Sequence, residues 1–141
     1  MGCGLAAALG VAACRPQRDV VAFVGDGDLL MGASSLWSLA GLRPANLLVV
    51  LLLDGRYSIT GGQPLSSSSS FPAVLAAFSD FHSELASTPD TVASCTTTLP
   101  RPGVVVARVQ SGPPPGPSPF VDPHRVAMRF AACAGGQGSE V

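Results

Sequence analysis

The sequence predicts an α/β protein, a three-layer sandwich in which helices pack on a mostly parallel sheet. Three continuous apolar runs, at residues 20–24, 47–53 and 103–109, have the length and composition of strands buried on both faces. Segments with apolar residues at helical spacing alternate with these runs. Because this alternation builds βαβ units, we expect the strands to pair in parallel.

Two helices are predicted near the start of the chain. Residues 4–14 are rich in Ala and Leu, which favour a helix. Arg15-Pro16 should end this helix, because the residue before a proline disfavours helical backbone. Residues 29–42 carry apolar positions at helical spacing, and we expect Trp37 to lie on this helix as a core residue.

A long loop is predicted after the second strand. Residues 54–70 are rich in Gly and Ser, and loops of this length are usually functional or disordered. We expect its Ser-rich part, residues 64–70, to be mobile. A short helix at residues 71–79 and a helix of poor propensity at 90–98 should follow.

The C-terminal part is predicted to hold a connector, a helix and a tail. Residues 111–119 are Pro-rich and should be extended. Residues 122–134 should form a final helix, with Asp122 as its N-cap. We expect residues 135–141 to be a disordered tail, so that one domain spans residues 1–134.

Composition excludes several classes of protein. The chain is 47% hydrophobic and 12% charged, with a formal net charge of −1. A nucleic-acid-binding protein would need a basic face, and a disordered chain would be less apolar. The four cysteines include no CxxC pair, so a zinc or iron–sulfur site is not expected, and we interpret them as small core residues in a reducing compartment.

The N-terminal residues do not match the pattern of a signal peptide or of a myristoylation signal. No Lys or Arg precedes the apolar segment 4–14, as a signal peptide would require. Ala6 stands where a myristoylation signal has Ser or Thr. Since no apolar run approaches about 18 residues, we expect no membrane span and a cytoplasmic protein.

The stretch Gly25-Asp26-Gly27 places a carboxylate between two glycines at the end of a predicted strand. Asp-Gly is common in turns, so a plain turn is one interpretation. The other is a metal–phosphate site, because glycine lets the backbone approach a ligand and Asp can hold Mg²⁺.

Two other patterns favour no site. Gly2-x-Gly4-x-x-Ala7 matches a loose dinucleotide fingerprint, but no strand precedes it as that fingerprint requires. His82, with Asp80 and Glu84 nearby, is typical of a solvated surface.

Asp26 and Asp54 each follow a predicted strand directly. Because the carboxyl ends of parallel strands meet at one edge of a sheet, the two carboxylates should converge on one crevice. The helix predicted at 29–42 begins there, and a helix N-terminus favours an anion. The residues therefore predict a Mg²⁺–diphosphate site.

These motifs resemble a known family. Gly25-Asp26-Gly27, followed by a polar residue at the end of the next apolar strand, is similar to the thiamine diphosphate motif, and TGGQP at residues 60–64 adds to the likeness. The chain resembles the diphosphate-binding domain of sulfopyruvate and phosphonopyruvate decarboxylases, closely over residues 1–64 and loosely over 100–132. The resemblance implies the thiamine diphosphate-binding fold, with thiamine diphosphate and Mg²⁺ as cofactors.

The resemblance also implies roles for individual residues. Asp26 and Asp54 would bind Mg²⁺ through their side chains, and Arg56 through its main-chain carbonyl. Met1 would prop the cofactor into its bent shape, and the loop from Tyr57 to Gln63 would close over it. The complete set of implied cofactor contacts is Met1, Gly2, Gly25, Asp26, Gly27, Asp28, Tyr57, Ile59 and Thr60.

The family's activity would then be decarboxylation of a small 2-oxo acid, with release of CO₂ and an aldehyde. The glutamate that activates the cofactor belongs to another domain in this family, so no catalytic residue is expected in this chain. A partner subunit with the pyrimidine-binding domain would supply it, in a dimer or higher oligomer. The sequence does not name the 2-oxo acid.

Two departures from the family pattern keep alternatives open. Asp54 stands where the motif has Asn, which adds negative charge near a diphosphate, and the strand and helix that precede this region in the family are absent, which predicts a domain truncated at its N-terminus. One alternative is a 2-oxo acid:ferredoxin oxidoreductase β-type subunit, although its cluster-binding cysteines are missing. The other is a degenerate, non-catalytic assembly subunit.

Overall fold

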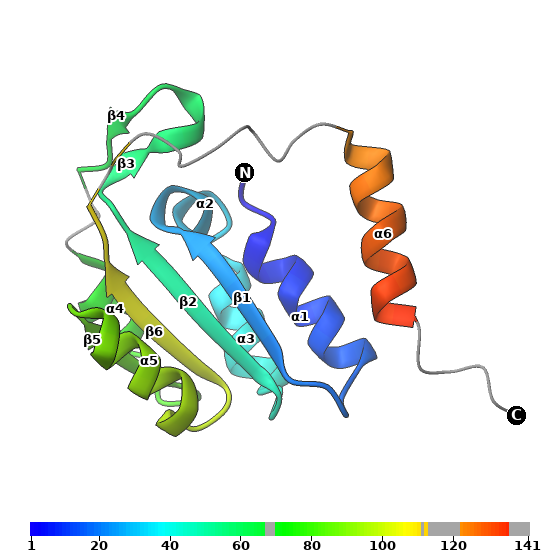
Figure 1. The fold of residues 1–141 in the computed structure, drawn as a ribbon. Helices are drawn as coiled ribbons and strands as arrows, with labels where there is room; N and C mark the ends of the chain where they lie inside the picture. The colour runs from blue at the N-terminus through cyan, green and yellow to red at the C-terminus, as the bar shows by residue number, and fades with distance from the viewer. Residues whose placement is uncertain (67–69, 111, 113–121, 136–141) are drawn as a thin grey trace, which may run out of the picture. The chain divides into compact units, whose positions relative to one another are not determined.

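A four-stranded sheet lies at the centre of the unit that spans Met1–Ser111 (Figure 1). The structure, a computed structural model, describes residues 1–66, 70–110, 112 and 122–135. In order across the sheet, the strands are β1 (Val20–Gly25), β2 (Leu47–Leu53), β6 (Gly103–Arg108) and β5 (His82–Ala86). Each neighbouring pair is parallel, so the predicted α/β fold and its parallel pairing are confirmed.

Strand β5 is the one strand of this sheet that the sequence did not predict. Its residues form no continuous apolar run, because β5 lies at the edge of the sheet and pairs with β6 alone. His82 and Glu84 are exposed on it, which confirms the solvated surface expected for them.

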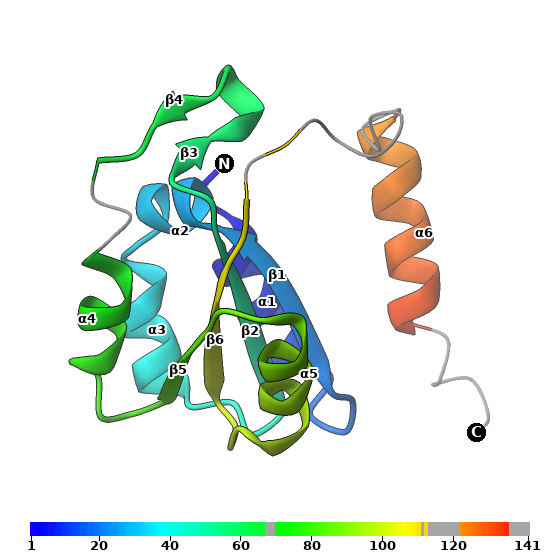
Figure 2. The same ribbon diagram turned by 60° about the vertical axis from the view of Figure 1, so that its left-hand side comes forward.

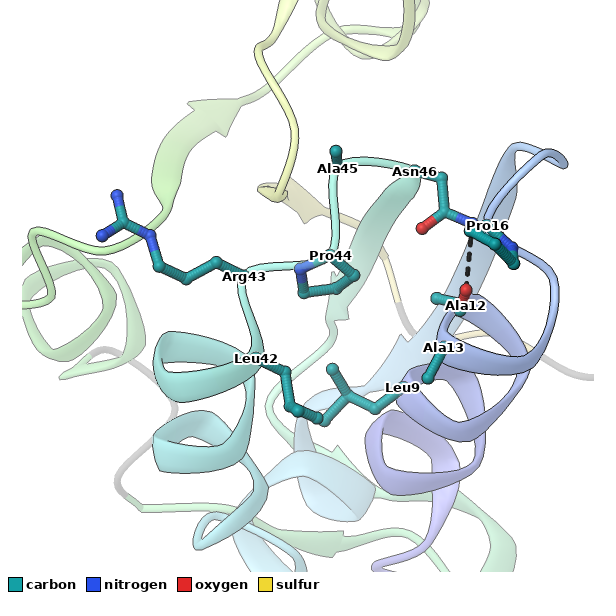
Figure 3. A pocket seen from close by; sticks show the side chains of 9 residues that line it. All are labelled: Leu9, Ala12, Ala13, Pro16, Leu42, Arg43, Pro44, Ala45 and Asn46. Atoms are coloured by element: carbon teal, nitrogen blue, oxygen red, sulfur yellow. Dashed lines mark hydrogen bonds between the residues drawn. The ribbon is translucent and has the colours of Figure 1, made fainter.

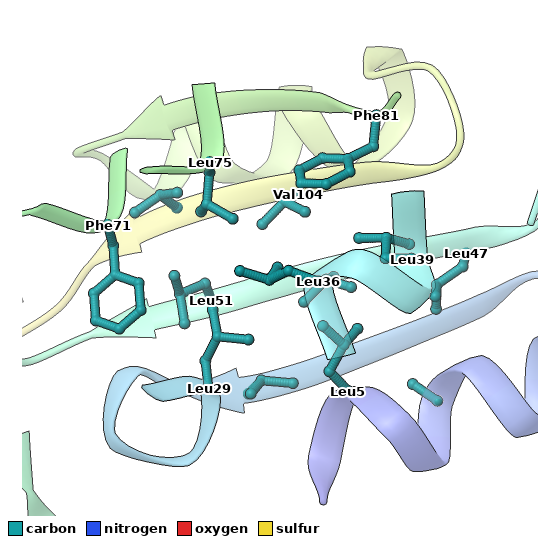
Figure 4. Close-up of a cluster of buried hydrophobic side chains, with 14 of the residues drawn as sticks. Leu5, Leu29, Leu36, Leu39, Leu47, Leu51, Phe71, Leu75, Phe81 and Val104 are labelled. Carbon is teal, nitrogen blue, oxygen red and sulfur yellow. The ribbon is translucent and has the colours of Figure 1, made fainter. Parts of the chain in front are cut away.

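Four helices cover one face of the sheet and form the larger core (Figures 1 and 2). They are α1 (Gly4–Cys14), α2 (Asp26–Met31), α3 (Ser35–Leu42) and α4 (Phe71–Ala76). Figure 4 shows Leu5, Leu29, Leu36 and Leu75 from these helices turned toward Leu51 of the sheet. Burial of each leucine contributes about 1.5–3 kcal/mol to folding, so this face holds the helices in place.

Helix α5 (Pro89–Thr98) covers the opposite face. Cys95 of this helix packs with Val50 and Val105 of the sheet. The β1 side of this face is open, with 71% of Phe23 exposed. The other three cysteines (Cys3, Cys14 and Cys133) are exposed, so the expectation of a core position is correct for Cys95 and wrong for them.

The helix predicted at residues 29–42 is two helices. Helix α2 starts at Asp26 itself and ends at Met31, and α3 begins at Ser35. The chain turns at Gly32, where a Cβ atom would overlap the carbonyl of Gly2. Trp37 is 66% exposed, so its predicted core position is wrong: Leu36 and Leu39 form the buried side of α3, and Trp37 packs edge-on against Phe78.

Three hydrogen bonds from Asn46 join the end of α1 and the segment after it to the start of β2, at the end of the sheet where the strands begin. The side-chain amide of Asn46 donates to the carbonyls of Ala12, Arg15 and Arg18, at 3.2, 2.9 and 2.8 Å. Asn46 also lines an open hollow of about 320 Å³ between α1 and α3 (Figure 3). Helix α1 ends at Cys14, as Arg15-Pro16 predicts.

The segment predicted as a loop at residues 54–70 contains a small hairpin. Strands β3 (Arg56–Tyr57) and β4 (Gln63–Pro64) pair antiparallel, with the 3₁₀ turn η1 (Ser58–Thr60) between them. Two positive-φ glycines, Gly61 and Gly62, return the chain to β4. Helices α4 and α5 match the helices predicted at 71–79 and 90–98. Helix α4 ends at Ala76, three residues before the predicted end.

The unit that spans Gly112–Val141 contains helix α6 (Pro123–Gly135). The Asp122 carboxylate accepts the backbone N–H groups of His124 and Arg125, at 3.0 and 3.3 Å, so its predicted capping role is confirmed. Parts of three predicted segments lie outside the described residues. They are residues 67–69 of the mobile loop predicted at 64–70, residues 111 and 113–119 of the connector, and residues 136–141 of the tail. Over the residues that the structure describes, no helix combines the length and apolarity needed to cross a membrane.

Candidate functional site

The predicted site lies where β1 and β2 end. Gly25 of β1 is level with Leu52 of β2, so Asp26 and Asp54 follow neighbouring strand ends. Figures 1 and 2 both show the N-terminus, α2 and the β3–β4 hairpin at this end of the sheet. In open parallel sheets, ligands bind at this edge.

Asp26 is buried, with 1% of its surface exposed. One carboxylate oxygen accepts the N–H of Gly27 and the other accepts the N–H of Gly55, both at 2.8 Å. Gly55 has a φ of 73°, a conformation that favours glycine, and this turn presents its N–H to Asp26. The Asp26 carboxylate therefore ties the end of β1 to the turn after β2.

The electrostatics of Asp26 are unfavourable to its charge. Burial raises the pKa of the Asp26 carboxyl above its ordinary value. The N–H groups of Gly55 and Gly27 act in the opposite direction, and the Asp54 carboxylate raises the pKa further. Two carboxylates thus interact at a strand end, and a divalent cation would remove the repulsion between them.

Asp54 is held by its own turn. One of its oxygens accepts the N–H of Arg56 at 2.9 Å, and the other accepts the hydroxyl of Ser58 at 2.6 Å. These bonds form an Asx turn that orients the carboxylate. Arg56 also donates from its guanidinium to the carbonyl of Gly62, at 3.0 Å, which stabilises the hairpin.

The hairpin packs on the first turn of α2. A Cβ atom on Gly27 would lie 2.7 Å from the ring of Tyr57 and 3.6 Å from the carbonyl oxygen of Arg56. Gly27 is therefore required for this close approach. Around Gly25, by contrast, a Cβ atom would meet nothing within 4 Å, so there is open space beside the Asp26 turn.

The N-terminal segment also contacts α2. The Asp28 carboxylate accepts the N–H groups of Gly2 and Gly4, at 2.5 and 3.0 Å. Sequence reasoning missed this side-chain role of Asp28, because no local pattern links two residues so far apart. Met1 is 45% exposed beside this anchor.

The structure thus brings most of the predicted residues to one end of the sheet. Hydrogen bonds and close packing connect Asp26 with Gly27, Asp54 with Arg56, and Gly27 with Tyr57. Separately, the Asp28 carboxylate accepts the N–H of Gly2, the residue after Met1. Ile59 and Thr60 lie in the η1 turn at the hairpin tip; Ile59 is 72% exposed, and the Thr60 hydroxyl bonds to Tyr57 and Gln63 of the hairpin itself.

The donor chemistry at this edge fits a hard cation. Two carboxylates and a backbone carbonyl are oxygen ligands of the kind that Mg²⁺ prefers. Among the described residues, no group of three or more His, Cys, Asp or Glu side chains is placed to hold a metal. A metal here would therefore need a carbonyl such as that of Arg56, or oxygens of a ligand, to complete its coordination.

Comparison with known proteins gives these features a family. A family model described as "Thiamine pyrophosphate enzyme, C-terminal TPP binding domain" matches residues 1–97. The chain belongs to this family. The region matched contains both strand ends, the Asp26 turn and the hairpin, so the thiamine pyrophosphate-binding domain includes the whole candidate site.

Curated relatives of this thiamine pyrophosphate-binding domain include decarboxylases. A phosphonopyruvate decarboxylase from Streptomyces hygroscopicus is 37% identical over 143 residues, which cover 92% of this chain and 33% of the relative. A sulfopyruvate decarboxylase subunit beta from Methanothermobacter thermautotrophicus is 39% identical over 61 residues, which cover 43% of this chain and 33% of that subunit. The chain thus spans about a third or less of the curated relatives it matches first.

A solved structure supports the fold. It is described as that of a thiamin diphosphate-dependent enzyme from Mycobacterium smegmatis, and it superposes with a TM-score of 0.58 at 21% identity. The match covers 79% of this chain and 22% of that one. At this identity the likeness concerns the arrangement of strands and helices, which is that of the thiamine diphosphate-binding fold.

Proposed function

We propose that this chain is the diphosphate- and Mg²⁺-binding subunit of a thiamine diphosphate-dependent decarboxylase. Its substrate would be a small 2-oxo acid similar to sulfopyruvate or phosphonopyruvate, and its products CO₂ and an aldehyde. The family and the decarboxylase names of its relatives support this reaction class over the ferredoxin oxidoreductase alternative.

One arrangement carries the proposal: Asp26, which is buried, and Asp54 follow neighbouring strand ends, and the Asp54 carboxylate helps to raise the pKa of Asp26. Two interacting carboxylates at a buried strand end oppose each other's ionisation and so do not favour folding. A bound divalent cation turns the same arrangement into a favourable one, because it neutralises both charges. Binding of a metal would therefore account for the close placement of two carboxylates, beyond the hydrogen bonds that each makes within the chain.

Different residues of the chain would bind the metal and the diphosphate. Asp26 and Asp54 would give Mg²⁺ carboxylate oxygens, and Arg56 its carbonyl oxygen. Backbone groups at Gly25, Gly27 and Asp28 would bind the diphosphate, and the open space beside Gly25 supports this role. The further contacts would come from the N-terminal segment (Met1 and Gly2) and from the hairpin (Tyr57, Ile59 and Thr60).

Thiamine diphosphate, when bound, supplies the carbon nucleophile that decarboxylation of a 2-oxo acid requires. The chain would hold its metal and orient its diphosphate, and the hairpin from Tyr57 to Gln63 would cover the bound group and exclude water. The activating glutamate would come from a partner subunit that carries the pyrimidine-binding domain. A relative that is named as a beta subunit supports a two-subunit enzyme, and a cytoplasmic location remains our prediction.

Calorimetry tests this proposal directly. Thiamine diphosphate is titrated into the chain, alone and together with the pyrimidine-domain subunit, in Mg²⁺ and then in EDTA. We expect binding that needs both Mg²⁺ and the partner and that is lost in Asp26→Ala. Asp90→Ala is the matched control, because Asp90 is also an acidic residue in the first turn of a helix. Absence of binding in every mixture would refute the proposal.

The degenerate-subunit alternative has an observation of its own. Both oxygens of Asp54 are already hydrogen-bonded within its turn, and its charge opposes that of Asp26. Asp54→Asn separates the two functions, because the amide restores the residue of the family motif and removes one negative charge. Weaker cofactor binding in Asp54→Asn would identify Asp54 as a ligand, and much tighter binding would identify a decayed site.

A further inference from the structure

The Asp28 carboxylate makes the contacts that hold the N-terminal segment, Met1–Gly4, to α2. Its two oxygens accept separate backbone N–H groups, from Gly2 at 2.5 Å and from Gly4 at 3.0 Å. Hydrogen bonds to an ionised group are stronger than those between neutral groups. A single side chain therefore closes a link across 24 or more residues of sequence.

Close packing supports the same link. A Cβ atom on Gly32, just after α2, would overlap the backbone of Gly2, and a Cβ atom on Gly2 would lie 3.3 Å from Met31. The N-terminal segment thus lies against the C-terminal end of α2 with no side chain between the two backbones. Because the Asp26 turn is the other end of the six-residue helix α2, the helix joins the two parts of the site.

We propose that Asp28 is a positioning residue: through its carboxylate it sets where Met1 and Gly2 lie relative to the metal-binding turn at Asp26. This inference rests on the proposed function, since it concerns how the chain presents cofactor contacts. In this proposal the Asp28 side chain acts through the amides of Gly2 and Gly4, which its two oxygens accept, and not as a ligand of the cofactor.

The contact needs a two-oxygen acceptor at residue 28 and a glycine at residue 4. An Asn side chain has one acceptor oxygen, so Asp28→Asn keeps one of the two bonds, and Asp28→Ala keeps neither. A Cβ atom on Gly4 would lie 2.6 Å from an Asp28 oxygen, so Gly4→Ala should push the carboxylate away. Alanine also favours helix α1, so this variant disturbs the anchor without an equal loss of global stability.

Amide hydrogen exchange measures the anchor without any cofactor. In Asp28→Ala we expect the Gly4 amide to exchange about tenfold faster, since it loses a charge-assisted hydrogen bond. Asp28→Asn should give a smaller increase, and the amides of β6 should show only the global change. Asp90→Asn, which removes the same charge from the first turn of α5, should leave the Gly4 amide unchanged. An unchanged Gly4 amide in Asp28→Ala would overturn the anchor.

Cofactor titration measures the positioning effect. With the pyrimidine-domain subunit and Mg²⁺ present, we expect Asp28→Ala and Gly4→Ala to bind thiamine diphosphate about fivefold more weakly, as the loss of one well-placed contact would give. The Mg²⁺ requirement should persist in both variants, because the Asp26 turn is intact. Tighter binding in Asp28→Ala would overturn the inference, since it would mean that the carboxylate repels or competes with the diphosphate.

The two measurements also separate this inference from the proposed function. If the wild-type chain binds no cofactor in any mixture, the proposed function fails and the positioning role fails with it. Exchange at Gly4 would then still show whether the anchor itself exists. If the wild type binds and Asp28→Ala binds equally well with a released anchor, the proposed function stands and the positioning role is refuted.

Discussion

We expect Gly27→Ala to destabilise the chain when residue 57 is Tyr and to stabilise it when residue 57 is Ala. Gly27 lies in helix α2, and a Cβ atom there would approach the Tyr57 ring to 2.7 Å. Such overpacking typically costs about 1–3 kcal/mol. Alanine in place of glycine in a helix gains about 0.5–1 kcal/mol. In the wild type the steric cost should exceed the gain, and Gly27→Ala should destabilise the chain by up to about 2.5 kcal/mol.

Removal of the ring removes the cost and leaves the gain. In a Tyr57→Ala background we expect Gly27→Ala to stabilise the chain by about 0.5–1 kcal/mol, and the coupling energy between the two positions to be about 1–3 kcal/mol. Tyr57→Phe is the matched control, because it keeps the ring and removes only the hydroxyl. Gly27→Ala should remain destabilising in that background.

Urea unfolding of the six proteins, followed by circular dichroism, gives these free energies. The reasoning fails if Gly27→Ala has the same effect in all three backgrounds, because the hairpin would then not pack on the Asp26 turn. That result would also remove the structural basis for a hairpin that covers a bound cofactor.

Two further predictions concern charge and hydrogen bonding. Because the folded pKa of Asp26 is raised, the folded chain keeps this proton at pH values where the unfolded chain has lost it. The stability of the wild type relative to Asp26→Asn should therefore fall as the pH rises from about 3.8 through the raised folded pKa. Urea unfolding from pH 4 to 8 checks this prediction, and parallel stability curves for the two proteins would contradict it. Asn46→Ala should lower the free energy of unfolding by about 1–3 kcal/mol in the same assay, since the two amide protons that serve three carbonyls are gone. Asn46→Asp, which has no donor, should lower it by at least as much. A loss below about 0.5 kcal/mol would contradict this prediction.

The predicted elements that were correct depend on strong local signals. The run at residues 47–53 is apolar throughout because β2 is central and both of its faces are covered, and this is legible in one dimension. Asp122 is predictable as a cap because a capping carboxylate serves the next residues of its own helix, as it does here. In both cases the interacting groups are neighbours in sequence, or the environment is uniform along the segment.

The errors occur where a distant segment decides. Trp37 fits a helical apolar pattern as well as Leu36 does, and only the packing of α3 on the sheet shows which of them faces inward. The single helix expected at 29–42 breaks at Gly32, where the N-terminal segment lies against the chain. Strand β5 is short and polar, and it forms because β6 offers a free edge to pair with.

The sequence by itself determined that Asp26 and Asp54 each follow a buried strand directly, because apolar runs, glycines and carboxylates of this kind carry their information locally. Only the tertiary structure decided what those carboxylates experience. It buries Asp26 between the N–H groups of Gly27 and Gly55, with the charge of Asp54 acting on it, and it commits Asp28 to the amides of Gly2 and Gly4. The physical reason is that burial, repulsion and hydrogen bonding depend on distances through space, which the chain sets only when it folds.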